Sequence, residues 1–97
     1  MLDFYFIPND QTKPPYPTDL EFAGELDGNV FGRLQSKGII DKRFDYYSDF
    51  RWSEVLLKQI RKTIDDKQLH SDTDVKKLLQ FVDTALEKQS GLIAYGD

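Results

Sequence analysis

The stretch SDTDVKKLLQFVDTALEKQSGLIAY, from Ser71 to Tyr95, contains the clearest helical pattern of the chain, followed directly by a short apolar run. From about Asp72 to Ser90, apolar residues recur at helical spacing and fill one broad arc, with charged and polar residues on the other side. Ser71 or Asp72 is suited to cap the first turn, and Gly91 is suited to end the helix. The apolar run after this stop, up to Tyr95, predicts a short strand.

A second strand is expected at the other end of the chain. Residues 2–7, LDFYFI, alternate in side-chain direction and are rich in aromatic rings, and Pro8 ends them. Near Ile7 we expect this strand to be buried on both faces. The prolines of residues 13–17 predict an extended connection, because each proline restricts its own backbone and that of the residue before it. Its P-x-x-P spacing is a polyproline ligand pattern, but a stiff surface connection explains it equally well.

A first helix is predicted from about Leu20 or Gly24 to Lys37, with Gly38 as its stop. Interior glycines weaken it, since each costs up to about 1 kcal/mol relative to alanine. The helix is therefore either held by packing or broken near Gly28.

The next helix is predicted to start after a cap at Asp49 or Ser53. Its apolar stripe steps through Trp52, Leu56 and Ile60 toward the end of the helix, and charged residues occupy the opposite face. The position of Trp52 at the top of this stripe suggests a core anchor, which competes with a role for its indole at an interface.

Terminal strands with helices between them predict an α+β fold, in which about three helices pack on a small sheet formed by the N- and C-terminal strands. The alternative is an all-α bundle with ordered tails. A third strand is expected from residues 38–40 or 44–47. The length of 97 residues suits a single domain, 1–97.

The composition excludes several kinds of functional site. The chain has no cysteine, so a disulfide framework, a thiolate zinc site and a cysteine nucleophile are excluded. A reducing compartment suits such a chain. The first residues have no basic leader of a signal peptide, and no apolar run approaches the length of a membrane span. We therefore expect a cytoplasmic protein.

The formal net charge is −4, and the acidic residues gather at the front, where residues 1–30 hold six of them against Lys13 alone. Such a surface repels phosphate backbones and disfavours nucleic acid as a partner. It would attract and steer a basic protein. The alternative is that the charge serves only solubility.

The segment RFDYYSDFRW, from Arg43 to Trp52, has five aromatic and four charged residues among its ten. Rings interleaved with charges are typical of a recognition surface. In the interpretation as a binding surface, Tyr46, Tyr47 and Asp49 project outward while Phe44, Phe50 and Trp52 face the core. The alternative has all five rings packed internally. The candidate partner-binding residues are Arg43, Asp45, Tyr46, Tyr47, Asp49 and Arg51.

No motif for catalysis, cofactor binding or metal binding is recognised. His70 lies among aspartates, but the stretch lacks the glycine and the final glutamate of a calcium loop, and no second histidine completes a zinc pair. The boundary between two helices explains these residues. We expect no catalytic residues, no metal and no cofactor. Two alternatives to a binding module stay open: a homo-oligomeric structural or regulatory protein, in which a homodimer buries the same rings, and a small enzyme using Arg43, Asp45 and Arg51.

The pair Tyr46 and Tyr47, with Asp45 and Asp49 beside it in a small acidic chain, resembles bacterial toxin immunity proteins of the colicin nuclease inhibitor type. The resemblance covers these few positions together with size and charge. The proline that follows the tyrosines in that family is absent here, and end strands do not suit a plain four-helix inhibitor. The resemblance implies an inhibitor that blocks a basic toxin by covering its surface.

Overall fold

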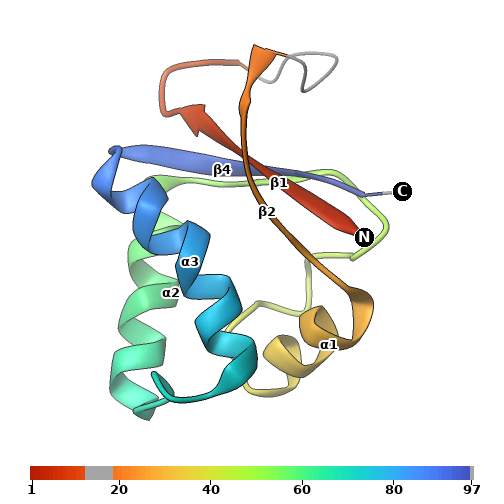
Figure 1. Cartoon of the computed structure of the whole chain (residues 1–97), viewed down its shortest axis with the longest axis vertical. Helices are drawn as coiled ribbons and strands as arrows, with labels where there is room; N and C mark the ends of the chain where they lie inside the picture. Colours follow the sequence, from red (N-terminus) through yellow and green to blue (C-terminus); the bar gives the residue numbers. More distant parts are fainter. Residues whose placement is uncertain (13–18, 97) are drawn as a thin grey trace.

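A computed structural model of the chain describes residues 1–12 and 19–96. Within them the elements are β1 (Leu2–Pro8), β2 (Glu21–Leu26), α1 (Gly28–Ser36), β3 (Phe50–Trp52), α2 (Glu54–Lys67), α3 (Thr73–Glu87) and β4 (Ser90–Tyr95). The strands form an antiparallel sheet in the order β2-β1-β4-β3, and the helices lie on one side of it (Figure 1). The predicted α+β fold, with the strands from both chain ends in one sheet, is confirmed, and the all-α alternative is wrong.

The centre of the sheet is the pairing of the two chain ends. β1 lies antiparallel to β4 with Phe4 opposite Ala94, so both termini lie at the same end of the sheet (Figure 1). The ring of Phe4 is fully buried, with its centroid 4.8 Å from that of Phe81 on α3 and 5.1 Å from that of Trp52 on β3. Burial of these rings ties the sheet to the helical layer, because apolar surface removed from water is the main stabilising term in folding.

Helix α3 begins as the sequence predicts and ends differently. The side chain of Asp72 accepts hydrogen bonds from the backbone N–H groups of Asp74 and Val75, which confirms it as the N-cap. The helix ends at Glu87, and Gln89 takes the left-handed conformation with φ of 56°. The prediction that Gly91 stops the helix is wrong. Gly91 lies in β4, where an added Cβ would come within 2.6 Å of the carbonyl oxygen of Trp52.

The helix predicted from about residue 20 or 24 to 37 is wrong in its first part. Residues Glu21–Leu26 form β2, and α1 begins at Gly28 after the N-cap Asp27, whose Oδ1 accepts from the N–H of Val30 at 2.8 Å. The edge of β1 supplies backbone partners to this segment, and such tertiary pairing overrides weak helical propensity. The predicted stop is confirmed, since Gly38 follows α1 with φ of 75°.

The third strand predicted at residues 38–40 or 44–47 is also wrong, since the remaining strands are β2 and β3. Ile39 and Ile40 are buried without being in a strand, because the chain turns back under α1 there. Between the two alternatives for the cap of α2, the structure selects Ser53, whose hydroxyl accepts from the N–H of Leu56.

The sheet face opposite the helices carries a row of rings. Tyr5 on β1 makes edge contacts with Phe22 on β2 and Tyr95 on β4, at centroid distances of 5.5 and 5.8 Å. Ile7 and Ile93 on this face are also buried, which agrees with the expectation that the first strand is buried on both sides near Ile7.

The P-x-x-P pattern of residues 14–17 lies outside the described residues. In the described part of the chain, every helix is too short or too polar to cross a bilayer.

Candidate partner-binding site

Hydrogen bonds order the loop between α1 and β3. Asp45 closes a turn in which its carboxylate accepts from the N–H of Tyr47 at 3.0 Å and from the hydroxyl of Ser48 at 3.3 Å. The side-chain amide of Gln35 on α1 donates to the carbonyl of Phe44 at 2.8 Å, which ties the loop to the helix. Aspartate favours such turns because its short side chain reaches backbone N–H groups two residues ahead. The two tyrosines are therefore held on an ordered turn.

Three rings of the aromatic segment point to the interior, as expected. Trp52 is fully buried, and Phe44 and Phe50 pack against it and against each other, with centroid distances between 5.0 and 5.9 Å. They form the end of the core beneath the loop.

The two tyrosines differ in exposure. Tyr46 is half-buried and lies against Phe31 on α1, and an added Cβ at Gly28 would come within 3.6 Å of its ring. Tyr47 is 71% exposed, and its ring stands at 88° to that of Tyr46 with 5.1 Å between centroids. Tyr46 thus acts as a fixed support for an exposed ring.

A hollow of about 540 Å³ opens between α1 and this loop, and we call it the aromatic groove. Its lining residues are Gly28, Asn29, Phe31, Gly32, Gln35, Lys42, Phe44, Asp45, Tyr46 and Tyr47. Gly28 and Gly32 place no side chains on the α1 side of the groove, and the rings of the loop form the other side. A concave surface with rings and a few polar groups fits an apolar side chain of a partner.

The remaining candidate residues lie around or away from this groove. Arg43 is exposed, with its guanidinium 4.8 Å from the ring centroid of Phe44. Asp49 is exposed and accepts from the backbone N–H of Gly96 at 3.1 Å. Arg51 donates to the carbonyls of Pro8, Asn9 and Gln11, and so fixes the segment after β1.

The structure therefore brings Asp45, Tyr46 and Tyr47 together at the groove, with Arg43 and Asp49 beside them in the chain. Arg51 has a structural role elsewhere. Within the described residues, no hydrogen bond or ion pair joins Arg43, Asp45 and Arg51, the set considered for an enzyme.

An acidic row crosses the sheet at the same end, and sequence reasoning missed it. Asp3 on β1 is directly opposite Glu25 on β2 and opposite Tyr95 on β4. Asp49 continues this row through its bond to Gly96, next to Tyr95. We call Asp3, Glu25 and Asp49 the acidic row. Like charges opposite one another across strands are destabilising, so this pairing weakens the sheet. A single sequence reveals the acids but not the register that aligns them.

A carboxyl group with a strongly lowered pKa, that of Asp74, lies away from the groove, between α1 and α3. Arg33 makes a two-pronged contact with Asp74, at 2.6 and 3.0 Å, and Lys37 lies 2.6 Å from Asp72 and 3.4 Å from Asp74. The hydrogen bond from Arg33, followed by that from Lys37, lowers the pKa of Asp74 to about 2, against the opposing effect of burial. The hydrogen bond from Lys37 also lowers the pKa of Asp72. We call Arg33, Lys37, Asp72 and Asp74 the α1–α3 brace, because their ion pairs join α1 to the start of α3. Each of the four charges is paired within it.

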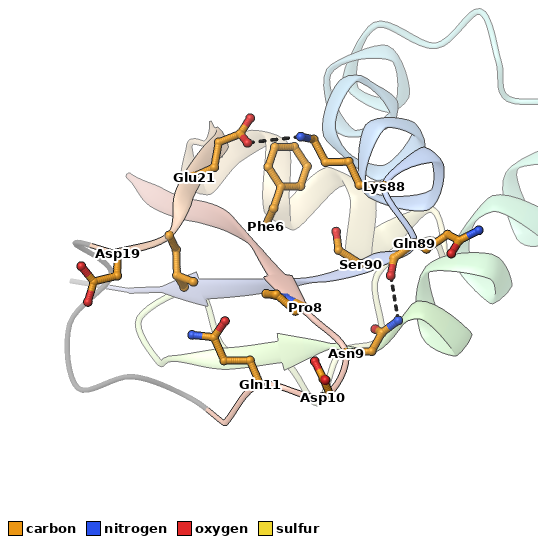
Figure 2. Close-up of a pocket in the computed structure, with 11 residues that line it drawn as sticks. Phe6, Pro8, Asn9, Asp10, Gln11, Asp19, Glu21, Lys88, Gln89 and Ser90 are labelled. Atoms are coloured by element: carbon orange, nitrogen blue, oxygen red, sulfur yellow. Dashed lines mark hydrogen bonds and ion pairs between the residues drawn. The ribbon is translucent and has the colours of Figure 1, made fainter.

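A second hollow, of about 550 Å³, lies at the opposite end of the sheet (Figure 2). Two pairs of polar groups meet in it: Lys88 lies 3.2 Å from Glu21 and 5.1 Å from the ring centroid of Phe6, and Asn9 donates to the carbonyl of Gln89 at 2.9 Å. These contacts connect β1, β2 and the start of β4, and give the residues a structural role.

His70 contacts Asp65 across the turn between α2 and α3, and both side chains are exposed. Over residues 1–12 and 19–96, the side chains that commonly bind metals do not gather in groups of three or more.

Comparison with protein-family models, with curated proteins and with solved structures finds no match to this chain.

Proposed function

We propose that this chain is a noncatalytic protein-binding module whose aromatic groove and acidic row contact a basic protein. One observation carries the proposal: Tyr47 is 71% exposed although the ring beside it, that of Tyr46, packs against the core. An exposed tyrosine on an ordered turn loses little conformational freedom on binding, and such rings are enriched among residues that dominate interface energies.

The charge of the surrounding surface supports a basic partner. Asp3, Glu25 and Asp49 lie at the end of the sheet from which the loop of Tyr47 extends, and an added Cβ at Gly96 would touch the backbone of Tyr47 and Ser48. Asp3 and Glu25 form no ion pair within the described residues. A lysine or arginine of a partner would relieve their mutual repulsion, and the net charge of −4 would steer the approach.

An inhibitor of the immunity type is one form of this proposal. It would act by covering the basic surface of a toxin, without chemistry of its own. The proposal takes only this mode of action from the resemblance, because the sheet of this chain is not a feature of a four-helix inhibitor. The cytoplasm is the compartment that suits a chain without cysteine.

The experiment compares the chain with Tyr47→Ala, Tyr47→Phe and Val55→Ala as baits for proteins of its own cell. Val55 on α2 is a matched control, because its side chain is 65% exposed and lies outside the groove. We expect a protein of basic isoelectric point that binds the wild type, Tyr47→Phe and Val55→Ala, and binds Tyr47→Ala at least about tenfold more weakly. Its affinity should fall as salt is raised from about 50 to about 500 mM, because salt screens the attraction between charges across the interface.

Equal capture by all four baits would remove the basis of the proposal. Sedimentation of the free chain tests the homo-oligomer alternative. A dimer that Tyr47→Ala dissociates would mean that a second copy occupies the groove, and the proposal of a basic partner would fail there.

A further inference from the structure

The outer edge of β2 has no strand partner among residues 1–12 and 19–96, and we call it the open edge. β2 is the first strand of the sheet order and pairs with β1 on one side only. Among the described residues, no backbone hydrogen bond joins β2 to any segment other than β1. Its six residues, EFAGEL, contain neither proline nor lysine, the residues that natural proteins often place on an edge to prevent pairing.

A bulge determines which face of the sheet each side chain of β2 occupies. The register changes from Phe4 opposite Gly24 to Tyr5 opposite Phe22, so Ala23 is an extra residue on β2. As a result Phe22 and Glu25, three positions apart, lie on the same face of the sheet, away from the helices. Regular alternation would have placed them on opposite faces.

A hollow of about 340 Å³ accompanies the edge. Met1 and Phe22, which are 49% and 51% exposed, line it together with Val30 and Phe81 from the helices. Lys77 and Gln80 on α3 add a charged and a polar side chain. Gly24 shapes this wall, because a Cβ there would come within 2.7 Å of the ring of Phe81. The hollow therefore offers apolar contacts for side chains of a strand laid along β2.

Charge indicates which strand would fit. Asp19, Glu21, Glu25 and Asp27 are all exposed on or beside β2, and residues 19–27 contain no lysine or arginine. Among the described residues, only Glu21 of these four acids has an ion pair, with Lys88. Pairing of β2 with β2 of a second copy would bring two such acidic sets together, which is unfavourable. A segment that carries lysine or arginine would neutralise them.

We propose that the open edge of β2 binds an extended, basic segment of a partner protein as a fifth strand. Main-chain hydrogen bonds to β2 provide affinity, a lysine or arginine faces Glu25, and an apolar residue packs on Phe22 and Met1. This surface differs from the aromatic groove, although Glu25 belongs to the acidic row as well, and the inference rests on the strand edge and not on the groove.

The test is selection from a displayed library of random decapeptides, followed by mapping of the synthetic peptides with amide shifts of the 15N-labelled chain. We expect enriched peptides that alternate lysine or arginine with β-branched residues, and shifts concentrated in β2 and the hollow beside it. N-methylation of alternate peptide residues should abolish binding in one register and leave it in the other, since only one set of N–H groups faces β2.

Protein variants provide matched controls. Phe22→Ser should lower the affinity for the peptides at least about threefold. Val55→Ser and Tyr47→Ala should leave this affinity unchanged. The inference is overturned if no peptide is enriched, if the shifts map to the groove of Tyr47, if N-methylation has no register dependence, or if the free chain dimerises through β2. None of these results depends on the bait experiment at Tyr47.

Discussion

At the scale of single residues, glycine shows how the same residue type serves different purposes. Gly91 and Gly24 stand where another part of the chain approaches the backbone too closely for a side chain, at the carbonyl of Trp52 and the ring of Phe81. Gly32 lies inside α1, and an added Cβ there would meet nothing within 4 Å. The sequence pattern predicted Gly91 as a helix stop and Gly32 as a helix-interior glycine, and it did not reveal which glycines lie against another part of the chain.

The contrast leads to a prediction for two alanine variants. Gly91→Ala should lower the free energy of unfolding by about 1–3 kcal/mol, because the new methyl group must displace a strand backbone. Gly32→Ala should raise it by up to about 1 kcal/mol, because alanine favours the helix and has space. Urea unfolding of both variants checks this, and the same sign for the two would contradict it.

At the scale of elements, the α1–α3 brace fixes the short α1 against the start of α3. Asp74 is 6% exposed, and its carboxylate forms ion pairs with Arg33 and Lys37. Asp72 caps α3 and forms an ion pair with Lys37. A lone charge at this position would be costly to bury, but the paired carboxylate is stabilised in its ionised form.

The brace predicts a loss of stability in acid. The pKa of Asp74 is lowered to about 2 in the folded chain, whereas an aspartate in an unfolded chain titrates near about 3.9. The ionised Asp74 therefore contributes its full share to the free energy of unfolding above a pH of about 4. This share is lost as the pH falls toward about 2, where the carboxylate is protonated in the folded chain as well. Asp74→Asn should lower the free energy of unfolding at pH 7 by about 1–3 kcal/mol and flatten its decline between these pH values.

Asp66→Asn is the control, because Asp66 has only an exposed contact with Lys62 one turn away. It should change the free energy of unfolding by less than about 0.5 kcal/mol and leave the acid profile unchanged. Chemical unfolding at steps of pH from 7 to 2 provides the measurement, and parallel profiles for wild type and Asp74→Asn would contradict the role of the brace.

At the scale of the whole molecule, residues far apart in sequence meet at one end of the sheet. Glu25, Asp3, Tyr95 and Asp49 come from four segments, and the loop of Tyr47 packs against the end of β4. The acidic row weakens the sheet, and in the proposed function a partner supplies the opposite charge. Such a conflict between stability and charge is typical of binding surfaces.

This conflict predicts opposite effects of one substitution. Glu25→Gln should raise the free energy of unfolding by about 0.2–1 kcal/mol, because it removes the repulsion with Asp3, and should weaken binding of the basic partner. Urea unfolding and titration of the captured partner measure the two effects. Glu21→Gln is the control, because it removes a contact with Lys88 and should not stabilise the chain. A loss of stability in Glu25→Gln would contradict the reading of the acidic row.

The sequence by itself determined the elements whose patterns are local. The strand of residues 2–7 and the helices that became α2 and α3 depend on spacing and on contacts within one turn. The sequence offered two candidates for each cap, and the structure selects Ser53 and Asp72. The sequence left open which rings of the aromatic segment face the core, and the structure places Trp52 inward and Tyr47 outward.

Only the tertiary structure decided the rest. β2 is a strand because β1 offers it an edge, Gly91 is required by the approach of β3, and Arg51 is held by carbonyls about 40 residues away in the chain. The acidic row and the open edge of β2 both result from strand register. Register depends on pairing between segments distant in sequence, and no local pattern encodes it.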